Sequence, residues 1–191
     1  YHLVVADLRD VTAVHVALRA AGIAEEAPTL FISEVVMVYL PPSAGTSLIG
    51  WAASTFSCAA FVTYEQILPH DAFGAMMVSN IASRGCPLKS IMEFPDIETQ
   101  CQRYTSHGWT ACEGKSMLDL YEHLTDAAEK TRVSRVEWFD EVEEWLLIQG
   151  HYCMIFATKD DSTSSSTPSA SDSIWHTCGL ALPDPGSVFP I

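Results

Sequence analysis

Three short apolar runs, separated by stretches of helical periodicity, constrain the fold of this chain more than any other feature. HLVVA at residues 2–6, TLFIS at 29–33 and AAFVTY at 59–64 are mostly apolar or β-branched and contain no charged residue. Strands have such continuous runs when helices cover both faces of a parallel sheet. The pattern therefore predicts parallel βαβ units in an α/β fold.

The stretch after the first run has the periodicity of a helix. Val11, Val14 and Leu18 recur on one face, while Asp10 is suited to cap the helix and Gly22 to end it. Polar and apolar spacing of the same kind predicts further helices. They cover residues 41–56, 71–84, 96–107, 116–124 and 138–148.

The second half of the chain holds two more predicted strands and a change of composition. WTACEG at 109–114 is a short strand, and HYCMIFATK at 151–159 is a strand expected to pair antiparallel to a neighbour. The serine-rich stretch that follows is too polar to offset the entropy of ordering it. We therefore expect a folded region over 1–159, a linker over 160–173 and the truncated start of another segment over 174–191.

Composition limits the classes of function. Ten basic and 24 acidic residues give a net charge of −14, which opposes nucleic-acid phosphates, so RNA contact would need a local basic patch or another part of the protein. The six cysteines form no CxxC pair and have no zinc spacing, as is typical of reduced thiols in a cytoplasmic protein. No apolar run approaches the roughly 20 residues that a membrane span needs. The chain also starts without methionine inside a predicted strand, which indicates a piece of a larger fold.

Three carboxylates occupy equivalent places in the predicted sheet. Asp7, Glu34 and Glu65 each follow one of the apolar runs, and the carboxyl ends of parallel strands border the ligand crevice of an open α/β sheet. All three are therefore expected to face one cleft. Helix capping or solvation explains acidic residues at strand ends equally well. Glu34 fits capping less well than the others, because six apolar residues follow it.

Signatures of nucleophilic or metal catalysis are missing from the sequence. Ser33 stands in FISEV and not in GxSxG, and there is no GxGxxG, P-loop, HExxH or EF-hand pattern. The seven histidines are scattered, so structural roles are predicted for them. The acidic residues between 137 and 144 predict a solvated helix face. We assign no catalytic side chain and no metal site.

Over residues 1–159 the chain contains the blocks YHLVVADLRD, TLFISEVVMVYL, FVTYEQI and HYCMIFATK. In their order and spacing these blocks resemble the leucine carboxyl methyltransferase family. Further blocks are FPDIETQ, GWTAC, FDEVEEW and SVFP. These are more similar to the family's branch that synthesises wybutosine in tRNA than to the branch that methylates the C-terminal leucine of type 2A protein phosphatase. In the wybutosine branch a kelch-type propeller follows the methyltransferase, which would account for residues 174–191.

The resemblance implies a class I, S-adenosylmethionine-dependent methyltransferase of Rossmann-like fold with a helical insertion. The family's glycine-rich turn, the acidic end of its second strand and an upstream arginine have no counterpart here, so the fold is expected to lack its first two strands. In the strand order 3-2-1-4-5-7-6, this leaves HLVVA without neighbours and gives TLFIS a free edge. These 191 residues alone are expected to be inactive and to hold the cofactor weakly.

The resemblance also implies roles for five residues. Asp7 and Leu8 would hold the adenine of S-adenosylmethionine, Glu34 would contact the cofactor, and Tyr39 and Glu65 would bind the substrate. The methyl acceptor would be a carboxylate of the wybutosine precursor in phenylalanine tRNA, with a subsequent methoxycarbonylation, or the C-terminal carboxylate of the type 2A phosphatase catalytic subunit. Both reactants are already activated, so the protein needs chiefly to align them. A non-catalytic, methyltransferase-like interaction module stays open as an alternative.

Overall fold

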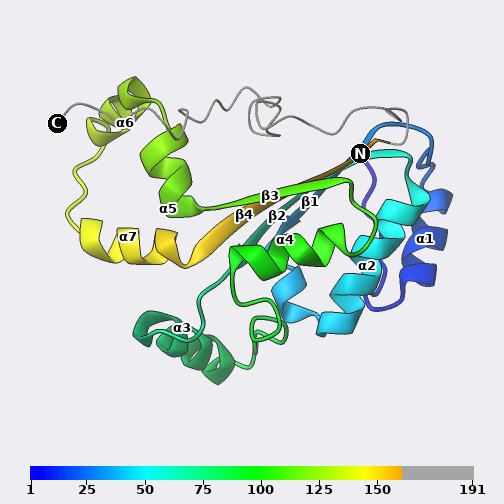
Figure 1. Cartoon of the computed structure of the whole chain (residues 1–191), viewed down its shortest axis with the longest axis horizontal. Coiled ribbons are helices and arrows are strands. Elements are labelled where there is room, and N and C mark those ends of the chain that lie inside the picture. Colours follow the sequence, from blue (N-terminus) through cyan, green and yellow to red (C-terminus); the bar gives the residue numbers. More distant parts are fainter. Residues whose placement is uncertain (161–191) are drawn as a thin grey trace.

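A computed structural model describes residues 1–160, which form a four-stranded mixed sheet with helices (Figure 1). The strands are β1 (Thr29–Glu34), β2 (Cys58–Gln66), β3 (Ala111–Ser116) and β4 (Tyr152–Asp160), in the order β1-β2-β4-β3. β1 and β2 are parallel, and β4 is antiparallel to both of its neighbours. This is the 4-5-7-6 part of the expected strand order, and the antiparallel pairing predicted for the last strand is confirmed.

The first apolar run is not a strand, so that prediction is wrong. Residues 2–6 pair with no strand in the described part of the chain, and the side chains of Leu3 and Val5 are 83% and 93% exposed. A β-strand requires a neighbour for its backbone hydrogen bonds, however favourable its composition is. β1 forms the edge of the sheet, with Leu30 and Ile32 exposed. The expectation that HLVVA lacks neighbours and that TLFIS has a free edge is therefore confirmed.

The described helices cover one face of the sheet more completely than the other. α1 (Val11–Ala20), α2 (Pro42–Thr55) and α4 (Ile97–Thr105) lie on the same side in Figure 1. Burial along β2 consequently alternates between buried and half-buried residues. The prediction of strands buried on both faces does not hold for β1 and β2 among the described residues.

Aromatic side chains fill the core between α2 and the sheet. Phe31 of β1 stacks on Phe61 of β2 with ring centroids 5.3 Å apart, and Phe56 meets Phe31 edge-to-face at 5.1 Å. The Trp109 indole N–H donates to the carbonyl of Ile49 at 3.2 Å. Such rings bury large apolar areas and prefer these offset arrangements. The contacts hold α2 against β1 and β2.

Helix caps follow the sequence closely. The carboxylate of Asp10 accepts hydrogen bonds from the amides of Thr12 and Ala13 at the start of α1. Asp71 caps α3 (Ala72–Ser83), and Asp96 forms a capping box with Thr99 at the start of α4. Side-chain oxygens at these positions satisfy amides that have no partner within the helix. The predictions for these three helices are confirmed.

The connection between β3 and β4 differs from the prediction. The helix expected over 116–124 is divided into α5 (Met117–Asp119) and a π-helical turn, η2 (Leu120–Leu124). α6 (Ala127–Ser134) was not predicted, and α7 (Val142–Gly150) begins four residues later than expected. No helix within residues 1–160 has the length and apolar character needed to cross a membrane. The predicted linker, apart from Asp160 in β4, and the segment over 174–191 lie outside the described residues.

Candidate functional site

Glu34 and Glu65 project from opposite faces of the sheet. β1 and β2 are parallel, and Glu34 is paired in register with Tyr64. Because successive side chains in a strand alternate between faces, Glu65 points away from the face that carries Glu34. Glu34 is exposed at the end of β1, whereas Glu65 is fully buried. The structure therefore does not bring these two carboxylates into one cleft.

Glu65 instead caps a turn that follows β1. Its Oε1 atom accepts hydrogen bonds from the amides of Val36 at 3.2 Å and Met37 at 2.8 Å, and Oε2 accepts one from Val38 at 3.0 Å. These amides begin the short 3₁₀ helix η1 (Met37–Tyr39). The first amides of a helix have no partner within it, and a carboxylate satisfies them strongly. Glu65 thus lies behind the turn and holds it.

The turn over residues 35–39 is strained at its first residue. Val35 has a φ of +50°, a conformation that β-branched residues avoid because of backbone crowding. Its amide donates to the carbonyl of Tyr64 at 2.8 Å. On the other side, the Ser90 amide donates to the Val38 carbonyl and the Ser90 hydroxyl to the Met37 carbonyl, both at 3.1 Å. Surrounding hydrogen bonds therefore keep the turn in place despite the strain.

The environment of Glu65 shifts its titration. Burial raises the pKa of the Glu65 carboxyl to about 7, while the amides of the turn and the charge of Arg103 act in the opposite direction. Arg103 is itself buried, and desolvation lowers its pKa. Its guanidinium lies 4.2 Å from the centre of the Phe94 ring. Its Nε and Nη2 atoms have no hydrogen-bond partner among the described residues. With a pKa of about 7, the Glu65 carboxyl gains or loses its proton near neutral pH.

Tyr39 ends the turn and is half-buried. It packs against a second apolar cluster that contains Val38, Leu88 and Ile91. Burial raises the pKa of the Tyr39 phenol, so the phenol keeps its proton at neutral pH and can donate a hydrogen bond. Glu34 and Tyr39 are thus joined by a turn of defined conformation, at the carboxyl end of β1.

Asp7 and Leu8 lie in the loop before α1 and have different environments. Asp7 is exposed, and its carboxylate meets the guanidinium of Arg9 at 2.6 Å. Hydrogen bonds from the Arg9 side chain and amide lower the pKa of Asp7 to about 2. Leu8 is half-buried and contributes to the wall of an apolar cavity of about 270 Å³. The cavity lies between this loop, α1, β1 and α2.

Ser33 provides a polar atom in the cavity. Its hydroxyl oxygen is buried and has no hydrogen-bond partner among the described residues. Val36 and Trp51 line the same cavity, so it extends from Leu8 to the beginning of the turn.

The sequence did not indicate roles for Ser33, Arg103 and Ser90. No local pattern shows which distant groups a side chain contacts. Within residues 1–160, no group of three or more His, Cys, Asp or Glu side chains is arranged to hold a metal ion.

This chain is similar in sequence to leucine carboxyl methyltransferases and to a tRNA wybutosine-synthesizing protein. A family model described as leucine carboxyl methyltransferase matches residues 1–53. The tRNA wybutosine-synthesizing protein 4 of Homo sapiens is 40% identical over 184 residues, which cover 96% of this chain and 26% of that protein. The leucine carboxyl methyltransferase 1 homolog of Arabidopsis thaliana is 39% identical over 160 residues, covering 84% of this chain and 48% of that protein.

The chain spans about half the length, or less, of these two relatives. Among solved structures, a phosphoethanolamine N-methyltransferase 2 of Haemonchus contortus aligns with 69% of this chain and 33% of its own chain. The sequence identity is 11% and the TM-score is 0.41.

Proposed function

Since this chain belongs to the leucine carboxyl methyltransferase family, we propose that its protein transfers a methyl group from S-adenosylmethionine to a carboxylate. We further propose that the carboxylate belongs to the wybutosine precursor in phenylalanine tRNA, which is then methoxycarbonylated. The observation that carries this choice is the extent of similarity. It covers 96% of the chain for the wybutosine-synthesizing protein and 84% for the methyltransferase 1 homolog, at nearly equal identity.

The residues present fit part of a site for S-adenosylmethionine. The cavity beside Leu8 offers an apolar wall with one unpartnered hydroxyl, that of Ser33, which suits a flat heterocycle. The Asp7 carboxylate is exposed next to it, and it would accept a hydrogen bond from an exocyclic amine in competition with Arg9, which it binds in this structure. Glu34 is exposed at the strand end, where its charge would attract the cationic part of the cofactor. When bound, the cofactor supplies a methyl group already activated on a sulfonium.

In this proposal Tyr39 orients the substrate. The phenol stays protonated at neutral pH and would donate a hydrogen bond to one oxygen of the acceptor carboxylate. The other oxygen is then free to attack, and no general base is needed because a carboxylate is already ionised. Glu65 contributes to substrate binding from behind, by holding the turn that carries Tyr39.

A second acceptor is favoured by a specific observation. The chain carries a net charge of −14, which repels a tRNA backbone and is compatible with a protein substrate. The 39% identity to a leucine carboxyl methyltransferase 1 homolog also supports the C-terminal carboxylate of the type 2A phosphatase catalytic subunit as the acceptor.

We place either activity in the cytoplasm, in keeping with the five free cysteines of the described residues.

The test starts with calorimetric titration of S-adenosylmethionine into this chain and into the full-length product of its gene. We expect clear binding by the full-length product and weak or no binding by these 191 residues. Methyl transfer is then compared between phenylalanine tRNA that carries the carboxylate precursor and the phosphatase catalytic subunit. Absence of cofactor binding by the full-length product would refute the proposal and favour a non-catalytic interaction module. Transfer to the phosphatase alone would select the second acceptor.

A further inference from the structure

The helical arm between β3 and β4, residues 117–150, contains no fully buried residue. It consists of α5, η2, α6 and α7 and projects beyond the end of the sheet (Figure 1). The arm buries little of its surface, yet it carries many large apolar side chains. Those that are exposed are Tyr121, Val133, Val136, Trp138, Phe139, Val142, Leu147 and Ile148.

The two most exposed of these side chains lie in the connection between α6 and α7. Trp138 is 83% exposed, Val136 is 72% exposed and Phe139 is 51% exposed. Trp145 of α7 packs edge-to-face on Tyr121, with ring centroids 4.6 Å apart, and Phe139 meets the same indole edge-to-face at 6.5 Å, so one side of Phe139 is in contact with the arm. Single exposed apolar residues are common, but a contiguous patch marks an interaction surface. We call residues 136–144 the acidic–aromatic segment.

The acidic–aromatic segment carries five carboxylates and no basic residue. Among the described residues, none of these carboxylates has an ion pair or a side-chain hydrogen bond. Glu143 and Glu144 lie in the first turn of α7, where the helix dipole favours negative charge. This explanation does not extend to Glu137 and Asp140, which precede the helix. Unpaired carboxylates therefore flank the exposed Trp138 and Phe139 in the sequence.

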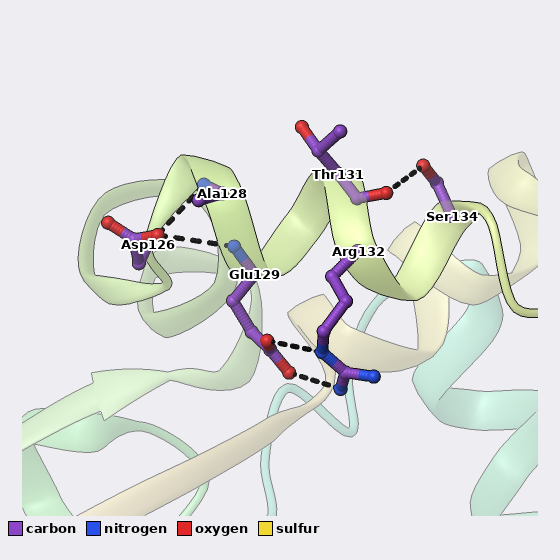
Figure 2. Close-up of polar contacts among 6 residues, drawn as sticks. All are labelled: Asp126, Ala128, Glu129, Thr131, Arg132 and Ser134. Atoms are coloured by element: carbon purple, nitrogen blue, oxygen red, sulfur yellow. Dashed lines mark hydrogen bonds and ion pairs between the residues drawn. The ribbon is translucent and has the colours of Figure 1, made fainter.

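Two of the three Lys and Arg side chains of the arm are engaged within it. Arg132 donates two hydrogen bonds to Glu129, at 2.6 and 2.7 Å, on α6, whose first amides are capped by Asp126 (Figure 2). Lys130 donates to the carbonyl of Glu122 at 2.9 Å and lies over the ring of Tyr121. These two charges are therefore not free to neutralise the acidic–aromatic segment. Of the arm's Lys and Arg side chains, that leaves Arg135, directly before the segment, to offset five carboxylates, so most of their charge is available to a partner.

The negative charge of the acidic–aromatic segment indicates which kind of partner can bind it. A second copy would bring another net charge of −14 toward it, and residues 161–191 contain neither lysine nor arginine. Nucleic acid and anionic lipid are repelled for the same reason. We propose that the acidic–aromatic segment is a docking site for a basic polypeptide, in which Trp138 and Phe139 enter an apolar groove and the carboxylates contact surrounding Lys and Arg side chains. Aromatic anchors of this kind dominate the energy of protein interfaces.

Titration of the 191-residue chain with a synthetic amphipathic peptide of lysine and leucine tests this proposal. A peptide of the same apolar pattern with glutamate in place of lysine is the matched ligand control. Binding is followed by tryptophan fluorescence, because an exposed indole shifts its emission to shorter wavelength when it is covered. We expect saturable binding of the lysine peptide, weakened at high salt, and a shift that disappears in Trp138→Phe.

Charge reversal then locates the site. We expect Glu137→Lys/Glu141→Lys to weaken binding of the lysine peptide at least tenfold. Glu26→Lys/Glu93→Lys, which changes the net charge equally at exposed positions elsewhere, should leave it within about twofold. Equal loss in both variants, equal binding of the glutamate peptide, or no binding by the unmodified chain would overturn the proposal. So would a dimer in sedimentation velocity that Trp138→Ala abolishes, because a second copy would then occupy the surface.

Discussion

Replacement of Glu65 by glutamine tests the role of the buried carboxylate behind the 35–39 turn. The variant keeps the size of the side chain and one acceptor oxygen but removes the charge. Burial raises the pKa of Glu65 from 4.5 to about 7 in the folded protein. Consider a carboxyl whose pKa is higher in the folded protein than in the unfolded chain. Its contribution to stability is complete at a pH below the pKa of the unfolded chain, and it is lost as the pH rises through the pKa of the folded protein.

The magnitude follows from the size of the pKa shift. Each unit is worth about 1.4 kcal/mol, so the free energy of unfolding of the unmodified chain should fall by about 3 kcal/mol between pH 4.5 and pH 7.5, relative to Glu65→Gln. The comparison uses the change with pH, because glutamine also places an amide N–H₂ against one of the turn's amides and so adds a constant offset.

Urea unfolding of both proteins at pH 4.5, 6 and 7.5 measures this difference. Glu26→Gln, which changes an exposed carboxylate, controls for the lost charge. A pH-independent difference, or one that changes in favour of the unmodified chain as pH rises, would refute the reasoning. It would show that the three amides of the turn outweigh the cost of burying the charge.

Three further substitutions have defined outcomes. Gly45→Ala should lower the free energy of unfolding by about 1–3 kcal/mol, measured by urea denaturation, because a Cβ there would overlap the Arg103 guanidinium; full stability would show that Arg103 is free to move away. Tyr104→Phe should cost about 1–3 kcal/mol in the same assay, because it leaves the buried Thr63 hydroxyl without its partner. Tyr39→Phe in the full-length product should lower kcat/KM for methyl transfer about tenfold or more, at unchanged stability. The reason is that a hydrogen bond to a charged group is worth about 1.5–3 kcal/mol. Unchanged kinetics would show that Tyr39 does not belong to the substrate site.

Local features of the sequence predicted much of the fold. Asp10, Asp71 and Asp96 cap helices as expected, because a capping side chain acts on amides only two or three residues away. The apolar runs of β1, β2 and β4 also became strands, because each has a hydrogen-bonded neighbour in the sheet. In these cases either the interactions that determine the element are short-range, or the apolar composition of the segment already indicates that it is buried.

The arrangement of the candidate site was decided by long-range contacts. HLVVA has the composition of a strand but no neighbour among the described residues, so its composition was insufficient. Glu34 and Glu65 look equivalent at their strand ends, yet the register of β1 on β2 sends them to opposite faces. Glu65 is buried where it binds amides of the 35–39 turn, whereas Glu34 is exposed. These amides lie 27–29 residues away from Glu65 along the chain. Hydrogen-bond partners at such separations depend on strand register and helix packing, and therefore only the tertiary structure determines them.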